Sequence, residues 1–328
     1  MRAAVFEDTK KLVYRENFPN PIPGPDDALV KVNYCGICGG DITNYKLKLY
    51  QTPLIMGHEF VGEVVELGDN IRNYKIGDKV LGINVQLDVL KGDFKAMGIF
   101  QDGGFAEYVK VPRDFLFPIP KSITSLEACC LVESYATAIR AKKLSKIPEH
   151  QNIIIIGAGA LGSTTLGVLL SETNPIYVLV IEKQEFLRTK AKEMGATEVL
   201  PPNQRRISQF SKQNGSATYI FECVGNDKTF KLALDLIKRG GTVVLEGIYR
   251  GTIAFPLMLV NSKEVHIQGV LGHDREDILD AIELVEKKKV DPSKLISEIV
   301  PLKDIQSAFE NFLEPGERNF LKIIVKIS

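Results

Sequence analysis

Residues 153–162 read Ile-Ile-Ile-Ile-Gly-Ala-Gly-Ala-Leu-Gly, an apolar run that leads directly into a G-x-G-x-x-G pattern. The isoleucines are typical of a parallel strand that is covered on both faces. Glycine permits a tight turn after such a strand, close approach to a pyrophosphate, and tight packing of the helix behind it. The next apolar run, residues 178–181, ends at Glu182, where an acidic residue can bind ribose hydroxyls. This combination predicts a dinucleotide-binding α/β fold; the alternative is an α/β turn that uses its glycines only for packing.

The expected cofactor site follows from this pattern. A helix is predicted to begin at Ala160, with its first N–H groups facing the phosphates. Glu182 favours NAD because its carboxylate would repel the 2′-phosphate of NADP, a repulsion that Lys183 beside it reduces. Ligands of an open parallel sheet bind at the carboxyl ends of its strands, so the backbone after the later strands is expected to line the nicotinamide pocket. The predicted site consists of Gly157, Gly159, Ala160, Leu161, Gly162, Glu182, Cys223, Val224, Gly225, Gly247 and Leu271.

Composition narrows the class of protein. At 328 residues the chain is long enough for two domains with hydrophobic cores, and 45% apolar residues is ordinary for a globular protein. Lys plus Arg and Asp plus Glu number 41 each, so no net charge favours nucleic acid or an anionic membrane as a partner. No apolar run is long enough to cross a bilayer or to form a signal core at the N-terminus. Five unevenly spaced cysteines do not suggest a disulfide framework, and we expect a cytoplasmic protein.

Local patterns divide the chain into three parts. Residues 1–132 contain short strands separated by turn residues, which predicts a β-rich domain. Residues 133–272 alternate between strands and helices, which predicts a doubly wound parallel sheet. Residues 273–328, with a helix over 276–286 and a last strand over 319–326, are expected to return to the first domain. Further strands are expected at residues 28–34, 60–67, 79–83, 105–111, 153–156, 177–181, 219–222, 242–245 and 265–268.

Candidate metal ligands lie upstream of the glycine turn. Cys38 lies in the sequence Cys-Gly-Ile-Cys-Gly-Gly-Asp, His58 lies in Gly-His-Glu-Phe, and Glu133 begins Glu-Ser-Tyr-Ala-Thr. Thiolate, imidazole and carboxylate groups all bind zinc, and three such ligands with one open position form a catalytic site. Spacing alone leaves an alternative of equal weight, in which these residues are a buried thiol, a core histidine and a surface glutamate.

The same segments carry a resemblance to a known family. The two motifs around Cys38 and His58, Gly-Asp-Lys-Val at 77–80, Asp-Gly-Gly-Phe-Ala-Glu-Tyr-Val at 102–109 and the glycine turn occur in the order seen in zinc-containing medium-chain alcohol and polyol dehydrogenases. The chain resembles this family over nearly its whole length. The resemblance implies a GroES-like β-rich catalytic domain, interrupted in sequence by a Rossmann cofactor domain, with the active site in the cleft between them.

The resemblance also implies metal ligands. It implies a catalytic zinc ion on Cys38, His58 and Glu133, with Glu59 as an alternative ligand and Asp41 orienting the histidine. A glutamate in the third position is similar to the sorbitol, threonine and sugar dehydrogenase branch of the family.

Two departures from the family bear on the site. Many relatives hold a second, structural zinc ion on four closely spaced cysteines, but residues 81–103 contain no cysteine, so one zinc ion per chain is expected. Relatives often place a hydroxyl of a proton relay two residues after the ligand cysteine, where this chain has Gly40. We expect the hydroxyl of Thr43 to take part in a rerouted relay.

The activity that the resemblance implies is oxidation of a secondary alcohol, in a polyol or a related sugar alcohol, with hydride transfer to NAD. Threonine or aldose-sugar oxidation is the alternative within the same branch. A zinc-free relative that reduces quinones or enones, or that binds nucleotide without turnover, is a third hypothesis. The expected partner is a small alcohol, and a homodimer or homotetramer is expected because residues 265–268, as an edge strand, could pair across a two-fold axis.

Overall fold

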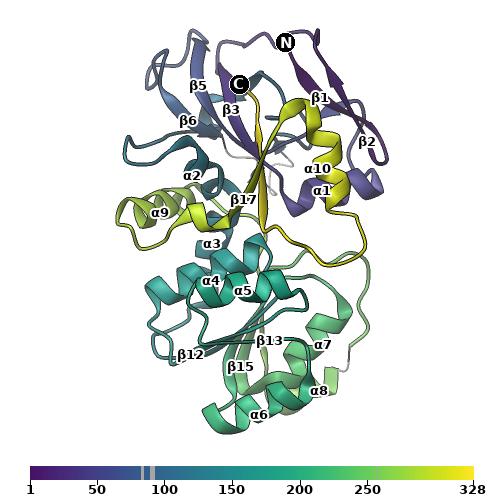
Figure 1. The fold of residues 1–328 in the computed structure, drawn as a ribbon. Coiled ribbons are helices and arrows are strands. Elements are labelled where there is room, and N and C mark those ends of the chain that lie inside the picture. Colours follow the sequence, from purple (N-terminus) through teal and green to yellow (C-terminus); the bar gives the residue numbers. More distant parts are fainter. Residues whose placement is uncertain (83–84, 89–92, 256) are drawn as a thin grey trace. The chain divides into compact units, whose positions relative to one another are not determined.

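The computed structural model describes residues 1–82, 85–88, 93–255 and 257–328, and it divides into two compact units. The first unit contains Met1–Glu133, Asp291–Gly316 and Lys322–Ser328, and the second contains Ser134–Val290 and Glu317–Leu321. Figure 1 shows the elements of both units along the chain. This division differs from the expected return at residue 273, because residues 273–290 pack within the second unit.

The second unit is built on a parallel sheet whose strand order is β13-β12-β11-β14-β15-β16 among the described residues. Every neighbouring pair in this sheet is parallel, and the order is that of doubly wound dinucleotide-binding sheets. The expected doubly wound fold is therefore confirmed. The strands are β11 (Asn152–Ile156), β12 (Tyr177–Ile181), β13 (Glu198–Leu200), β14 (Ala217–Glu222), β15 (Ile237–Leu245) and β16 (His266–Gly269).

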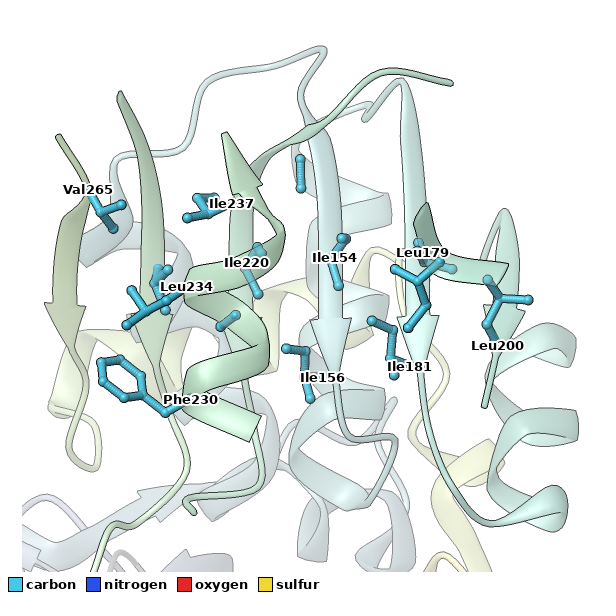
Figure 2. Packing of buried hydrophobic residues seen from close by; sticks show 14 of the residues in the cluster. Ile154, Ile156, Leu179, Ile181, Leu200, Ile220, Phe230, Leu234, Ile237 and Val265 are labelled. Carbon is cyan, nitrogen blue, oxygen red and sulfur yellow. The ribbon is translucent and has the colours of Figure 1, made fainter. Parts of the chain in front are cut away.

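Both faces of this sheet are covered. Ile154 and Ile156 of β11 join a buried cluster with residues of α6 and α7, as Figure 2 shows for Phe230 and Leu234 of α7. Ile153 and Ile155, which alternate with them and must point to the opposite face, are also fully buried. The continuous isoleucine run thus reflects burial on both faces. The helices are α3 (Ala136–Ser145), α4 (Ala160–Glu172), α5 (Glu185–Glu193), α6 (Gln204–Asn214), α7 (Asp227–Leu236), α8 (Leu257–Lys263) and α9 (Arg275–Glu286).

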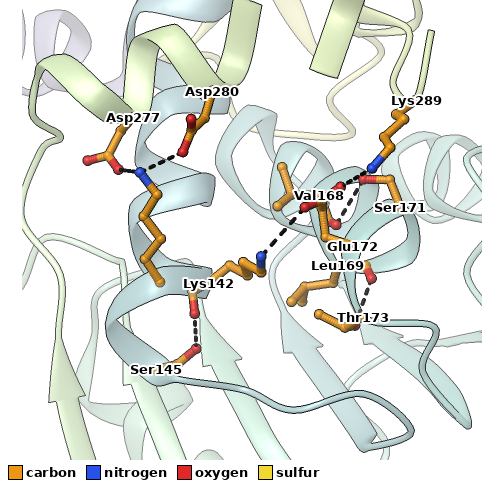
Figure 3. Close-up of polar contacts among 11 residues, drawn as sticks. Lys142, Ser145, Val168, Leu169, Ser171, Glu172, Thr173, Asp277, Asp280 and Lys289 are labelled. Atoms are coloured by element: carbon orange, nitrogen blue, oxygen red, sulfur yellow. Dashed lines mark hydrogen bonds and ion pairs between the residues drawn. The ribbon is translucent and has the colours of Figure 1, made fainter. Parts of the chain in front are cut away.

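Ion pairs with α3 and α4 accompany a buried apolar face of α9 in residues 273–290, which belong to the second unit. Lys143 of α3 lies 2.7 Å from carboxylate oxygens of both Asp277 and Asp280 on α9. Farther along, Glu172 at the end of α4 binds Lys142 at 3.5 Å and Lys289 at 2.6 Å (Figure 3). Apolar spacing predicts the helix α9 but carries no information about which unit receives it.

The first unit is rich in strands. A sheet in the described residues runs β10-β6-β5-β3-β18-β17, with β9 also paired to β3, and β2-β1-β4 form a smaller antiparallel sheet. β18 (Lys322–Lys326), from the end of the chain, pairs with β3 (Asp27–Gly36), so the C-terminal segment completes the sheet of the N-terminal domain. The other strands are β1 (Ala3–Asp8), β2 (Lys11–Arg15), β4 (Leu54–Ile55), β5 (Glu59–Leu67), β6 (Lys79–Gly82), β7 (Val85–Asp88), β8 (Asp93–Ala96), β9 (Tyr108–Pro112), β10 (Leu116–Pro118) and β17 (Ile296–Pro301).

Short helices complete the first unit. They are α1 (Gly39–Leu47), α2 (Ser125–Cys129), α10 (Ile305–Asn311) and the 3-10 turns η1 (Arg113–Phe115), η3 (Pro292–Leu295) and η4 (Leu302–Asp304). A π-helical turn, η2 (Leu131–Tyr135), spans the boundary of the two units. No helix in the described part of the chain is long and apolar enough to span a membrane.

The sequence located most strands to within a few residues. Three starts differ: β9 begins at Tyr108 rather than at 105, β18 at Lys322 rather than at 319, and β15 at Ile237 rather than at 242. Eight strands in the described residues were not expected, namely β1, β2, β4, β7, β8, β10, β13 and β17. β13 has three residues, too few for a periodic pattern. Residue 83, the last of the strand expected at 79–83, lies outside the described residues.

Candidate active site

Cys38 caps the N-terminus of α1. Its Sγ accepts a hydrogen bond from the N–H of Gly40 at 3.4 Å, and Oδ2 of Asp41 accepts one from the N–H of Cys38 at 3.0 Å. Burial raises the pKa of the Cys38 thiol, and the nearby His58 opposes that shift without cancelling it. The helix start therefore fixes the thiol beside the imidazole.

His58 is almost fully buried, and its Nδ1 lies 3.3 Å from Oδ1 of Asp41. Among the described residues, neither atom makes a hydrogen bond of good geometry. Burial lowers the pKa of His58, but the negative charges of Asp41 and Cys38 outweigh this effect and the net pKa is well above its usual value. With Nδ1 turned to Asp41, Nε2 is left for another partner, which is the arrangement of a histidine that binds a metal.

Glu59 follows His58 and forms a buried ion pair with Lys322. Its Oε2 lies 2.5 Å from Nζ of Lys322, and both side chains are 1% exposed. Gly36 on β3 makes room for this pair, since a Cβ there would lie 2.1 Å from Oε2 of Glu59. Burial raises the pKa of Glu59, and the charge of Lys322 opposes that shift without cancelling it.

Glu133 lies in the π-helical turn η2, a rare local geometry that is frequent at functional sites. Its Oε1 atom is buried. Burial raises the pKa of Glu133, while the charges of His58 and Lys322 lower it less strongly. Glu133 is thus an electrostatic neighbour of the histidine although 75 positions separate them in sequence.

The chemical types of these side chains suit a zinc ion. A thiol, an imidazole and two carboxyl groups share a buried region, and burial, with a smaller contribution from neighbouring negative charges, holds the pKa of Cys38, Glu59 and Glu133 above their usual values. A divalent cation would offset this cost by stabilising the deprotonated donors. As they stand, no three His, Cys, Asp or Glu side chains within the described ranges are gathered closely enough to hold an ion.

The expected relay residue lies on the first turns of α1. The hydroxyl of Thr43 donates a hydrogen bond to the carbonyl oxygen of Gly39 at 2.8 Å. A Cβ added at Gly40 would lie 3.8 Å from both Sγ of Cys38 and Cε1 of His58, which places Gly40 directly beside the two donors.

The glycine turn adopts the geometry that the sequence requires. Gly157 has a φ of +95°, and a Cβ there would lie 2.6 Å from Cγ2 of Val224. At Gly162 a Cβ would lie 2.0 Å from the carbonyl oxygen of Gly157, so only glycine allows α4 to start so close to the turn. Gly159 precedes α4, and Ala160 and Leu161 are its first residues.

The remaining cofactor residues follow the carboxyl ends of the strands. Glu182 follows β12, where Oε2 accepts a hydrogen bond from the N–H of Ala158 at 2.8 Å and Oε1 accepts one from Gln184 at 2.9 Å. A carboxylate has further acceptor positions for ribose hydroxyls. The others are Cys223, Val224 and Gly225 after β14, Gly247 shortly after β15, and the exposed Leu271 after β16.

Sequence reasoning missed Lys322, Glu222 and Glu246. Glu222 ends β14, and Glu246 directly follows β15, at the sheet edge where Glu182 follows β12. An acidic residue at the end of three apolar runs was a signal in the sequence that could have identified this group. Lys322 gave no such signal, because nothing local to it indicates a buried partner 263 residues away.

Two sequence families match the chain. The family described as alcohol dehydrogenase GroES-like domain matches residues 24–121, which include Cys38 and His58. The family described as zinc-binding dehydrogenase matches residues 165–287.

Individual relatives match over nearly the full length. D-xylulose reductase of Saccharomyces cerevisiae is 29% identical over 98% of this chain and 97% of its own. An uncharacterized zinc-type alcohol dehydrogenase-like protein of Escherichia coli, YdjJ, is 30% identical over 94% of each chain. Among solved structures, a zinc-binding dehydrogenase of Sinorhizobium meliloti bound to NADP superimposes with a TM-score of 0.90, at 28% identity over 99% of this chain and 98% of its own.

Proposed function

The chain belongs to the zinc-type alcohol and polyol dehydrogenases, and we propose that it oxidises a secondary alcohol of a polyol or sugar alcohol with NAD. The observation that carries this proposal is the buried group of Cys38, His58, Glu59 and Glu133, with Asp41 against the histidine, in a chain that also has a dinucleotide turn. The relatives' names, among them a D-xylulose reductase, support a polyol as substrate.

We assign the zinc site to Cys38, His58 and Glu133, with Glu59 as an alternative ligand. A bound zinc ion supplies a Lewis acid that stabilises negative charge on the alcohol oxygen, and the bound nicotinamide supplies the hydride acceptor. The protein fixes the thiol by the helix cap and the imidazole by Asp41. Lys322 holds Glu59 away from solvent and supplies positive charge to the region.

The hydroxyl proton is assigned to a relay that includes Thr43. Its hydroxyl donates to Gly39, and its oxygen keeps acceptor positions for a water molecule or a substrate hydroxyl. General acid–base assistance contributes about 10² to 10⁴ in rate. Turnover of Thr43→Val at neutral pH should therefore fall at least about tenfold and recover as the pH rises, whereas Thr43→Ser should keep the relay. Unchanged turnover and pH profile in Thr43→Val would remove Thr43 from the mechanism.

NAD is proposed over NADP because Glu182 lies beside the glycine turn. We propose binding through Gly157, Gly159, Ala160, Leu161 and Gly162, with Cys223–Gly225, Gly247 and Leu271 along the nicotinamide. We propose that residues 1–132 and 273–328 have catalytic roles and that residues 133–272 bind the cofactor. The structural units divide elsewhere, with residues up to Val290 in the second unit.

The proposal extends to assembly and location. β16 is an edge strand, which supports a homodimer or homotetramer in which this edge is paired. All five cysteines are unpaired, which supports a reducing compartment such as the cytoplasm.

The decisive experiment is a substrate panel. Purified protein with zinc is supplied with NAD or NADP and with polyols, sugar alcohols, threonine, aldose sugars and simple alcohols, and NADH or NADPH formation is followed by absorbance. We expect the highest kcat/KM with a polyol and NAD. Turnover restricted to threonine or an aldose would replace the polyol assignment, and turnover of quinones or enones in metal-free protein would replace the dehydrogenase assignment.

A further inference from the structure

Neighbouring strands of the parallel sheet carry glutamates at the edge where the dinucleotide is expected. In register, Ile156 pairs with both Ile181 and Glu222, and Glu222 pairs with Leu245. Glu182, Glu222 and Glu246 therefore lie at the same edge. Glu182 accepts a hydrogen bond from the N–H of Ala158. Glu222 accepts from the N–H groups of Val224 and Gly225 at 2.9 to 3.1 Å and from the hydroxyl of Tyr249.

The hydrogen-bond donors to Glu246 are the side chains of Thr165 and Cys223. Thr165 Oγ1 lies 3.2 and 3.0 Å from the two carboxyl oxygens, and Sγ of Cys223 donates to Oε1 at 3.5 Å. The Glu246 residue is 3% exposed, so water contributes little to its solvation. Burial raises the pKa of Glu246 to about 8; the hydrogen bonds from Thr165 and Cys223 oppose the shift and the nearby Glu222 adds to it.

Both partners of Glu246 adjoin the glycine turn. Thr165 lies on α4, three residues after Gly162. A Cβ at Gly162 would lie 3.5 Å from Cβ of Cys223. The side chain of Val224, the next residue, fills the space beside Gly157. A displacement of the Cys223 side chain would therefore change the wall against which the turn packs.

We propose that Glu246 is a positioning residue for the dinucleotide: it receives the hydrogen bonds of Thr165 and Cys223 beside the glycine turn, and its carboxyl must be uncharged for an anionic pyrophosphate to bind there tightly. This inference rests on the proposed binding of a nicotinamide dinucleotide by that turn. In the described part of the chain, the ionisable groups that act on Glu246 are Glu222 and Cys223. Ionisation of Glu246 adds a buried negative charge beside Glu222, close to the turn expected to receive the anionic pyrophosphate. Loss of the proton would thus weaken cofactor binding.

The test is the affinity for NADH across pH 6.5 to 9.5, measured on full-length protein by the change in NADH fluorescence. When binding requires one protonated group, the Kd rises by about tenfold per pH unit above its pKa. Wild-type protein should show a constant Kd below neutral pH and a rise with a midpoint near that pKa. Glu246→Gln keeps the shape without the charge, and its Kd should stay flat. Glu264→Gln makes the same change at an exposed site of the same unit and should keep the wild-type profile.

A second variant keeps the test decisive if Glu246→Gln does not fold. Thr165→Val removes a hydrogen bond that lowers the pKa of Glu246, so the midpoint of the Kd rise should move to higher pH. The same pH profile in Glu246→Gln as in wild type, or a midpoint unmoved by Thr165→Val, would overturn the inference. Wild-type protein that binds no NADH at any pH would overturn the proposed function together with it, whereas pH-independent binding would overturn the inference alone.

Discussion

Nζ of Lys322 lies 2.5 Å from Oε2 of Glu59, and the two residues form a buried ion pair although 263 positions separate them in the sequence. The pair joins β18 to β5 across β3, where Gly36 leaves the space that it needs. The last strand of the chain thereby becomes part of the region around His58. Burial lowers the pKa of Lys322, but Glu59 and the neighbouring Cys130 and Cys38 raise it more, so the ammonium form is favoured.

Removing the ammonium group should destabilise the protein. Lys322→Met leaves Glu59 buried without its cation, and breaking a buried pair in this way costs about 3 to 5 kcal/mol. We expect that loss in the free energy of unfolding from urea titration at pH 7. The loss should shrink at lower pH, because a protonated Glu59 does not need a counter-charge. Lys322→Met combined with Glu59→Gln should recover most of it, and Lys326→Met, at the exposed end of the same strand, should change little. A Lys322→Met protein as stable as wild type would contradict this reading.

Purified protein should carry close to one zinc ion per chain. A chelator should remove the ion with loss of turnover and without unfolding, because both units have apolar cores of their own. Cys38→Ala and His58→Ala should lose zinc but keep NADH affinity, since the glycine turn belongs to the other unit. Cys130→Ala, at a buried cysteine outside the ligand set, should retain the metal. Metal analysis that finds two tightly held zinc ions would be incompatible with the assignment.

Glu182 should set the preference for NAD. Repulsion of the 2′-phosphate of NADP is worth a few kcal/mol, or roughly a hundredfold in the ratio of kcat/KM with NAD to kcat/KM with NADP. Glu182→Ala should narrow the ratio mainly by weakening NAD, because it also removes the hydrogen bond to Ala158. Glu182→Gln keeps an acceptor without the charge, so it should narrow the ratio mainly by improving NADP. Wild-type protein that uses both cofactors equally would show that Glu182 does not select at the ribose.

Asp277 should contribute stability that depends on pH. Burial raises the pKa of Asp277, but the N–H of Asp274 and the charge of Lys143 lower it more, so the net pKa lies below its usual value. A carboxyl with a lowered pKa stabilises the folded state above its unfolded pKa of about 4, and this contribution is lost as the pH falls through the folded pKa. Asp277→Asn should therefore cost about 1 to 3 kcal/mol at pH 7 and progressively less in acid.

Asp280→Asn is the matched control for that experiment. Asp280 binds the same Lys143 from the same helix but is 45% exposed, so its replacement should cost less than about 1 kcal/mol. Equal losses in the two variants, or a loss in Asp277→Asn that does not vary with pH, would show that the depressed pKa is not the source of the stability.

The features that the sequence predicted correctly depend on residues that lie close together in the chain. The strand β11, the turn at Gly157 and the start of α4 lie within one stretch, and their glycines and isoleucines are each required by geometry inside that stretch. The helix α9 was likewise visible from its own apolar spacing. Its placement in the second unit was not, because it depends on distant partners, among them the side chains of α3 more than 130 residues away that bind Asp277.

The sequence by itself determined a doubly wound dinucleotide fold, an acidic residue directly after its second strand and the identity of the candidate ligands, because each follows from backbone geometry or side-chain chemistry read locally. The tertiary structure alone decided that Lys322 pairs with Glu59, that Thr165 and Cys223 bind Glu246, and that Glu133 lies near enough to His58 for the two charges to interact. The distant segments that surround Glu59, Glu133 and Glu246 bury their carboxyl groups, and this burial raises the pKa of each. A residue's solvation depends on neighbours brought by distant segments, so no local pattern carries it.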